Sequence, residues 1–180
     1  MIIDKALSIN YNDFYLDNLN DNIIFDNYLS WLKNEEVNKY LEIRHNIPDI
    51  EKLKKFVNDN NNSNDNLLLG IFTNKKAHIG NIKLGPINKI YKRSTIGLFI
   101  GDRSYWGKGI ATYSIKAITD YAFKSLKLFR VDAGCYNDNI GSYKAFIKAG
   151  YKEEARLKNY WSIDNIYQDE IILTIFNNEN

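Results

Sequence analysis

The chain has 180 residues, of which 44% are hydrophobic and 14% aromatic, and its formal net charge is +2. This length fits a single domain, and the composition excludes a disordered chain. The small net charge argues against nucleic-acid binding, and the single cysteine, Cys135, excludes an intrachain disulfide. No apolar run approaches the roughly 18 residues of a membrane span, and Met1–Asn10 lacks a signal-peptide pattern. We expect a cytoplasmic protein without a membrane partner and, since its two histidines lie far apart, without a metal site.

The first third of the chain is polar and mainly helical in pattern. Residues 14–20 suit a short strand, and residues 23–44 carry apolar side chains at helical spacing with a break around Lys33–Glu36. Pro48 stands just before an amphipathic segment whose apolar face ends near Val57, which predicts a second helix. The asparagine-rich residues 58–66 predict a polar loop.

From Asn66 onward the pattern changes to strands. Apolar or alternating runs predict strands over 67–73, 77–85 and 94–101, followed by a helix from about Trp106 to Lys124. A strand over 128–136, a short helix closed by Gly150 and two strands over 151–162 and 166–176 complete the chain. This order predicts an α/β (α+β) domain with a mixed sheet of six to seven strands and about four helices.

A glycine turn between the strand at 94–101 and the following helix is typical of phosphate-binding loops. A Walker A loop is excluded because five residues separate Gly101 from Gly107, and because Gly109 rather than Ser or Thr follows Lys108. A dinucleotide fingerprint is excluded because Thr112 stands where the third glycine is required.

A third kind of phosphate-binding loop is indicated by two segments of the sequence. Residues 102–112 resemble the pyrophosphate-binding motif of the GNAT acetyltransferases, with Gly109 and Ala111 in register and Trp106 in place of the usual Gln or Arg. A second stretch, beginning 30 residues after Gly109, resembles the C-terminal half of that family and places in register Asn139, Ser142, Phe146, Gly150 and Tyr151. The resemblance is to the branch that includes ribosomal-protein alanine and small-amine acetyltransferases.

The resemblance implies a GNAT fold in one N-acetyltransferase domain over residues 1–180, with a helical acceptor-side region at 1–65 and an acetyl-coenzyme A-binding core at 66–180. It also implies a V-shaped splay between the fourth and fifth expected strands, where strand backbone would hold the pantetheine and polarise the thioester carbonyl. The expected coenzyme A contacts are Phe99, Ile100, Trp106, Gly107, Lys108, Gly109, Ile110, Ala111, Thr112, Asn139, Ser142 and Phe146.

The implied chemistry is direct acetyl transfer from acetyl-coenzyme A to a primary amine in a ternary complex, without a metal. Phe146 stands at the position of the tyrosine that serves many members as general acid, so Ser142 is the first candidate for that role and Tyr143 the second. The base stays open among Glu42, His45 and a water chain, with the further candidates Asp132, Glu153 and Glu154. We expect Cys135 to be a buried structural thiol.

The acceptor is the least determined part of the prediction. Resemblance to enzymes of surface-polysaccharide and nucleotide-sugar pathways suggests an amino sugar, free or nucleotide-linked. The residues expected to bind it are Arg44, His45, His78, Lys83 and Trp161. The alternatives are the N-terminus of a ribosomal or other protein, or a non-catalytic module that binds coenzyme A. A homodimer is left open.

Overall fold

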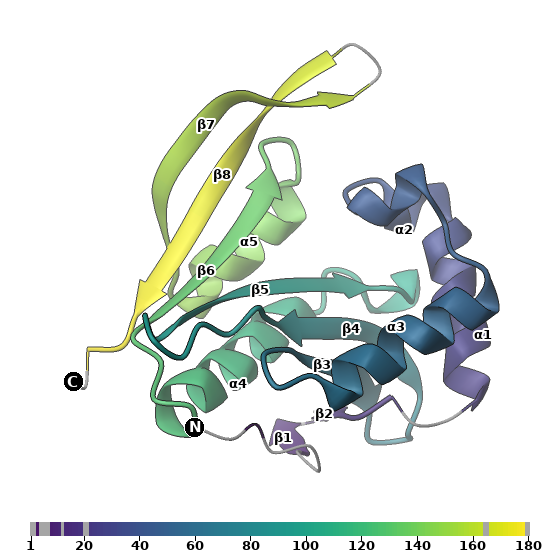
Figure 1. Ribbon diagram of the computed structural model, residues 1–180. Helices are drawn as coiled ribbons and strands as arrows, with labels where there is room; N and C mark the ends of the chain where they lie inside the picture. Colours follow the sequence, from purple (N-terminus) through teal and green to yellow (C-terminus); the bar gives the residue numbers. More distant parts are fainter. Residues whose placement is uncertain (1–2, 4–7, 12, 20–21, 164–165, 179–180) are drawn as a thin grey trace.

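The computed structural model describes residues 3, 8–11, 13–19, 22–163 and 166–178, which form one sheet with helices on both faces (Figure 1). The N-terminal elements are β1 (Ile9–Tyr11), β2 (Phe14–Asp17), α1 (Asn22–Lys33), α2 (Glu35–Asn38), the 3₁₀ turn η1 (Glu42–His45) and α3 (Ile50–Asn62). The remaining elements are β3 (Leu67–Thr73), β4 (His78–Leu84), β5 (Arg93–Ile100), η2 (Arg103–Tyr105), α4 (Ile110–Lys124), β6 (Arg130–Tyr136), α5 (Ile140–Ala149), β7 (Lys152–Ile163) and β8 (Ile166–Phe176).

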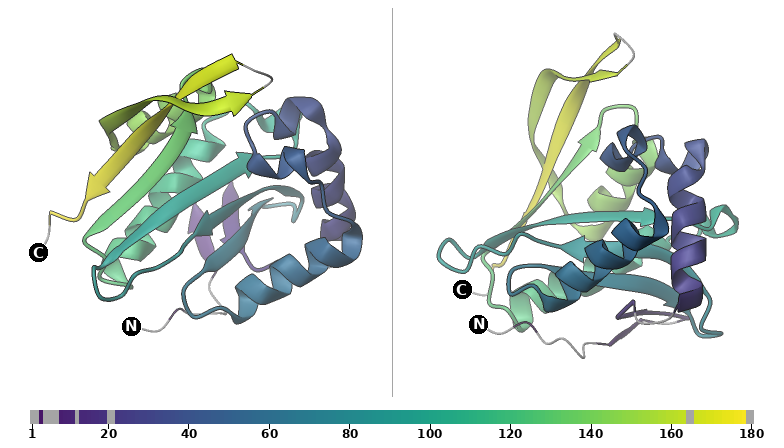
Figure 2. Two further views of the ribbon diagram at one scale, coloured as in Figure 1. Left: turned by 45° about the horizontal axis from the view of Figure 1, so that its top comes forward. Right: turned by 45° about the vertical axis from the view of Figure 1, so that its right-hand side comes forward.

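The eight strands of these residues are ordered β1-β2-β3-β4-β5-β6-β8-β7. Every pair is antiparallel except β5 and β6, which are joined through α4 as a parallel crossover requires. Their pairing spans only residues 93–95 and 130–132, after which β5 stays with β4 and β6 leaves with β8 (Figures 1 and 2). The mixed α/β sheet and the V-shaped splay are confirmed, and β1 adds one strand to the expected number.

Alternate residues of β3 enter two separate cores. Leu69 and Ile71 belong to a large cluster that also contains Ile115 of α4 and Val131 of β6. Leu68 belongs to a smaller cluster, which it shares with residues of α1 and α3. Because successive side chains of a strand point to opposite faces, α1 and α3 cover one face of the sheet and α4 and α5 the other (Figure 2).

Two predicted helix boundaries are wrong. The chain from Trp106 to Gly109 is a turn, and α4 begins only at Ile110 because Gly109, with φ +80°, is its left-handed N-cap. The predicted loop at 58–66 is helical as far as Asn62, where asparagine amides donate to carbonyls one turn back, Asn60 to Phe56 at 2.8 Å and Asn62 to Asn58 at 3.0 Å.

The short helix and the break near residue 34 are confirmed. Asn139 caps α5 by accepting from the Ser142 N–H at 3.1 Å, and Gly150 ends it with φ +104°. Asn34 separates α1 from α2 and caps the latter. Within the described part of the chain, no helix combines the length and the apolar character needed to span a bilayer.

Candidate active site

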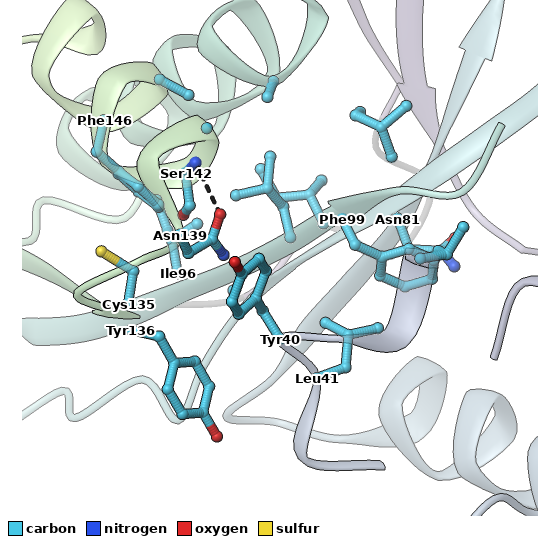
Figure 3. A pocket seen from close by; sticks show the side chains of 18 of the residues that line it. Tyr40, Leu41, Asn81, Ile96, Phe99, Cys135, Tyr136, Asn139, Ser142 and Phe146 are labelled. Atoms are coloured by element: carbon cyan, nitrogen blue, oxygen red, sulfur yellow. Dashed lines mark hydrogen bonds between the residues drawn. The ribbon is translucent and has the colours of Figure 1, made fainter. Parts of the chain in front are cut away.

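The splay between β5 and β6 opens into a cavity of about 1070 Å³. Its walls come from β5, the loop before α4, the start of α5, the inner strands β6 and β8, and the segment from α2 to η1. Figure 3 shows side chains of distant elements meeting around it, with Ser142 and Asn139 on one side and Tyr40 and Leu41 across from them.

The glycine loop forms one end of this cavity. Gly107 and Gly109 have φ of +72° and +80°, which few residues other than glycine adopt, and no side chain caps the first N–H groups of α4. The indole N–H of Trp106 donates to the Ile100 carbonyl at 2.8 Å, which ties the loop to the end of β5. The loop therefore presents backbone donors and the positive end of a helix dipole, an arrangement that fits a pyrophosphate.

The edge of β5 beyond the splay forms the adjoining wall. Residues 96–100 pair with β4 on one side only, because β6 has separated from β5 after Thr95. Phe99 and Ile100 both line the cavity. An unpaired strand edge can take an extended ligand as an added strand, which suits a pantetheine arm with its two amides.

The start of α5 faces this wall. Ser142 lines the cavity one turn before Phe146, whose ring is 2% exposed and packs edge-on against Tyr151 with centroids 5.0 Å apart. Phe146 thus belongs to the core and offers no proton to the cavity. Cys135 is buried, as expected, and burial together with the Glu170 and Glu153 carboxylates raises the pKa of its thiol to about 11, so it is protonated near neutral pH.

The opposite end of the cavity is aromatic and acidic. The Tyr136 ring lies 5.2 Å from Trp161 and 5.9 Å from Tyr40, centroid to centroid. The Tyr136 hydroxyl donates to Glu42 and accepts from the Arg44 guanidinium at 3.2 Å. Burial and the bond to Glu42 raise the pKa of Tyr136 to about 12, so this phenol is also neutral near pH 7.

Glu170 is a lining residue that the sequence analysis missed. It lies on β8 directly opposite Tyr136 on β6, and a Cβ added to Gly134 would overlap its carboxylate. Burial and the neighbouring Glu42 raise the pKa of Glu170. In the sequence, a glutamate within the alternating run of a strand was the available signal, but only the strand register shows that it faces the cavity.

Most of the residues expected to bind substrates line this cavity. The lining residues among them are Glu42, Lys83, Phe99, Ile100, Trp106, Gly107, Gly109, Ile110, Ala111, Thr112, Asn139, Ser142, Phe146 and Trp161. Their individual roles stay predictions.

Five other predicted site residues are not part of the lining: Lys108, Tyr143, Arg44, His45 and His78. Lys108 lies over the ring of Tyr105, 5.1 Å from its centroid, and Arg44 contacts the lining residue Tyr136 through its hydroxyl and over its ring, 5.3 Å from the centroid.

His78 is 7% exposed and belongs to the packing beneath the cavity. Its ring lies 4.8 Å from that of Trp31 and 5.1 Å from that of Phe72, and its Nε2 is 2.8 Å from the Asn81 Oδ1. Burial lowers the pKa of His78, which favours the neutral ring.

The sequence was compared with protein families and with known proteins. Residues 18–152 match the family described as Acetyltransferase (GNAT) domain. The probable N-acetyltransferase YjcK of Bacillus subtilis is 36% identical over 110 residues, which are 60% of this chain and 60% of that relative. The chain thus aligns with about three-fifths of that relative's length.

Two solved structures show the same fold. The spermidine N-acetyltransferase of Vibrio cholerae, in complex with CoA and spermine, superposes with a TM-score of 0.82 at 21% identity, covering 92% of this chain and 96% of that one. The ribosomal L7/L12 α-N-protein acetyltransferase RimL, in complex with coenzyme A, superposes with a TM-score of 0.83 at 19% identity, covering 97% and 100%.

Proposed function

Because the chain belongs to the GNAT N-acetyltransferases, a family of acyltransferases, we propose that it transfers the acetyl group of acetyl-coenzyme A to a primary amine of a small, positively charged molecule. The acceptor class we favour is a diamine or polyamine. The observation that carries this choice is the pair of carboxylates, Glu42 and Glu170, set among aromatic rings at the acceptor end of the cavity.

The donor half of the proposal is supported by the cavity wall. The glycine loop offers N–H groups to the pyrophosphate, and the free edge of β5 offers the pantetheine an extended backbone partner. A strand N–H near Phe99 or Ile100 is the candidate donor to the thioester oxygen, where it would stabilise the negative charge that develops during attack.

The acceptor half rests on charge and ring placement. The Glu42 carboxylate lies close enough to Glu170 to raise its pKa, so two like charges share one end of the cavity. A bound ammonium group relieves such repulsion, and the ring of Trp161 adds cation–π attraction, whereas Arg44 already lies over the Tyr136 ring and Lys39 over the Tyr40 ring. A second ammonium group on the acceptor would be held here in the same way. The solved spermidine acetyltransferase with this fold is consistent with such an acceptor.

A nucleotide-linked amino sugar is less well supported by this lining. Arg44 and His45, expected to meet its phosphates, are outside the lining, and Arg44 already donates to the Tyr136 hydroxyl and the Lys39 carbonyl. Lys83 does line the cavity, but its ammonium lies over the ring of Phe56, 5.9 Å from the centroid. Carboxylates at the acceptor end would repel phosphate.

Release of free coenzyme A from acetyl-coenzyme A, followed with a panel of acceptors, tests the proposal. The panel contains 1,4-diaminobutane, spermidine, glucosamine, a nucleotide-linked amino sugar and a peptide with a free N-terminus. We expect the highest kcat/KM with the diamine or polyamine. A preference for the nucleotide sugar or the peptide would overturn the acceptor class, and coenzyme A binding without turnover on any amine would indicate a non-catalytic module.

A matched pair of variants addresses the acceptor end directly. Glu42→Gln removes a charge from the cavity and should raise the KM for the polyamine about tenfold, the order expected of one charge-assisted contact. Glu35→Gln is the control, because Glu35 is an exposed residue of α2 outside the lining. Equal KM values for the two variants would contradict a cation-binding role for Glu42.

A further inference from the structure

Acetyl transfer to an ammonium group requires the nitrogen to lose two protons on the way to the amide. One ends on the coenzyme A sulfur as the C–S bond breaks, and the other must pass to solvent. We propose that the Glu170 carboxylate is the general base that takes this other proton from the acceptor amine. The inference rests on the proposed function and names a residue that lies outside the sequence motifs.

The strand register places Glu170 in position for this task. Tyr136 and Glu170 are directly opposite in the antiparallel pair of β6 and β8, so their side chains share the face that looks toward η1. Gly134, two residues before Tyr136, carries no side chain at the spot that the Glu170 carboxylate occupies, and both residues line the cavity. The carboxylate is half-buried where β6 turns away from β5.

The other acidic residues of the lining are already engaged. Glu42 accepts a hydrogen bond from the Tyr136 hydroxyl, and Glu36 is paired with Arg103. The Asp138 carboxylate accepts a hydrogen bond from the Gln168 amide at 3.3 Å. In the part of the chain that the structure describes, no hydrogen-bond donor or cation is bonded to Glu170. Its carboxylate is therefore free to accept a proton from a ligand.

His45 is outside the lining, and the three further candidate bases of the sequence analysis lie elsewhere on the sheet. Asp132 and Glu154 both bind the Arg130 guanidinium, and Glu153 is paired with Arg156 at 3.1 Å. None of these three carboxylates lines the cavity. The bond to Arg130 lowers the pKa of Glu154, which makes this carboxylate a poor proton acceptor.

The groups around Glu170 raise the pKa of its carboxylate, which favours base catalysis. From η1 it faces Glu42, and from β6 it faces Tyr136; the Cys135 thiol on the other face is close enough to be affected by the Glu170 charge, and both Tyr136 and Cys135 are neutral near pH 7. From β7 its cross-strand neighbour is Leu157, which is uncharged. Burial and Glu42 raise its pKa toward the working pH, where a base is most effective. The protonated Glu170 then releases its proton to solvent, which regenerates the carboxylate.

The step balances as follows. The ammonium gives one proton to Glu170, and the neutral nitrogen attacks the acetyl carbon. The C–S bond then breaks, Ser142 or a water molecule protonates the thiolate, and the second nitrogen proton replaces the one that this donor has given. Glu170 returns its proton to solvent. Overall, acetyl-coenzyme A and R–NH₃⁺ yield the acetamide, coenzyme A and H⁺.

The pH dependence of kcat with the best acceptor tests this role in Glu170→Gln. Wild type should rise with pH and reach a plateau once Glu170 is ionised, whereas the variant should rise tenfold per pH unit until the amine itself loses its proton. At pH 7 the variant should have a kcat about 10²–10⁴-fold lower, with unchanged affinity for coenzyme A. Glu170→Asp should keep the plateau at a lower kcat, which separates base catalysis from folding defects.

Glu153→Gln is the control, since it removes a carboxylate from the adjacent strand without touching the cavity. A raised KM with unchanged kcat in Glu170→Gln would show only a binding contact and overturn the proposal. A retained plateau would overturn it as well. Wild-type protein that turns over no amine at all would instead refute the proposed function, and the role of Glu170 would fall with it.

Discussion

The glycine loop before α4 is open to a test in which backbone strain is the only perturbation. In Gly109→Ala the new methyl group has room, since its nearest neighbour would be the Tyr113 ring carbon at 3.4 Å. The cost arises from φ +80°, which a residue with a Cβ adopts at a penalty of about 1–2 kcal/mol. A relaxed loop avoids this penalty, so coenzyme A must restore the strained form when it binds. Its affinity should fall about 5–30-fold.

Titration calorimetry with fragments of coenzyme A shows which part of the ligand loses affinity in Gly109→Ala. Coenzyme A and adenosine 3′-phosphate 5′-diphosphate, the fragment that contains the pyrophosphate, should lose affinity by the same factor. The affinity for pantetheine should not change. Gly150→Ala is the matched control, because Gly150 also has a left-handed φ, +104°, but lies at the far end of α5. That variant should lose stability in urea unfolding and keep its coenzyme A affinity. Equal coenzyme A affinities in the two variants would refute the cradle.

Two further predictions concern the chemistry and the sheet. Ser142→Ala should lower kcat about 10²-fold with little change in coenzyme A affinity, because Ser142 is the cavity hydroxyl closest in sequence to the missing acid at Phe146; an unchanged kcat would remove it as proton donor. Arg130→Met should destabilise the protein at pH 7 but much less in acid. Arg130 lowers the pKa of Glu154, so this stabilisation is present above the ordinary value of 4.5 and is lost as the pH falls through the lowered value. Urea unfolding from pH 7 to pH 3 measures it, and a difference between variant and wild type that stays constant would contradict the reasoning.

The glycine turn before α4 and the ends of α5 leave clear signals in the sequence because they depend on local backbone chemistry. The left-handed turn at Gly107 and Gly109, the cap at Asn139 and the helix end at Gly150 each involve residues within a few positions of one another. Such features leave recognisable spacing in the chain. The mixed sheet followed from the order of the elements, in which three strands are followed by a helix, a strand, a helix and two strands.

The errors occurred where side chains or distant contacts overrule local preference. Asparagine is a weak helix former, which is why residues 58–62 read as a loop. Asn60 nevertheless stays in α3, because its amide bonds back to Phe56 and the helix packs on the sheet through Leu53 and Val57. The sequence predicted His78 as an acceptor contact, and the structure places it outside the lining, packed against the rings of Trp31 and Phe72.

The acceptor end could not be predicted because the register of β7 and β8 determines it. A slip of one residue between β8 and β6 would turn Glu170 to the α5 face and away from Tyr136. A bulge lies between Leu157 and Trp161, and it brings Trp161 opposite Gln168 on the same face as Glu170. Asp169 holds this bulge by accepting from the Asn159 N–H at 3.0 Å. A change in the bulge would thus displace Trp161 while leaving the glycine loop and the free edge of β5 intact.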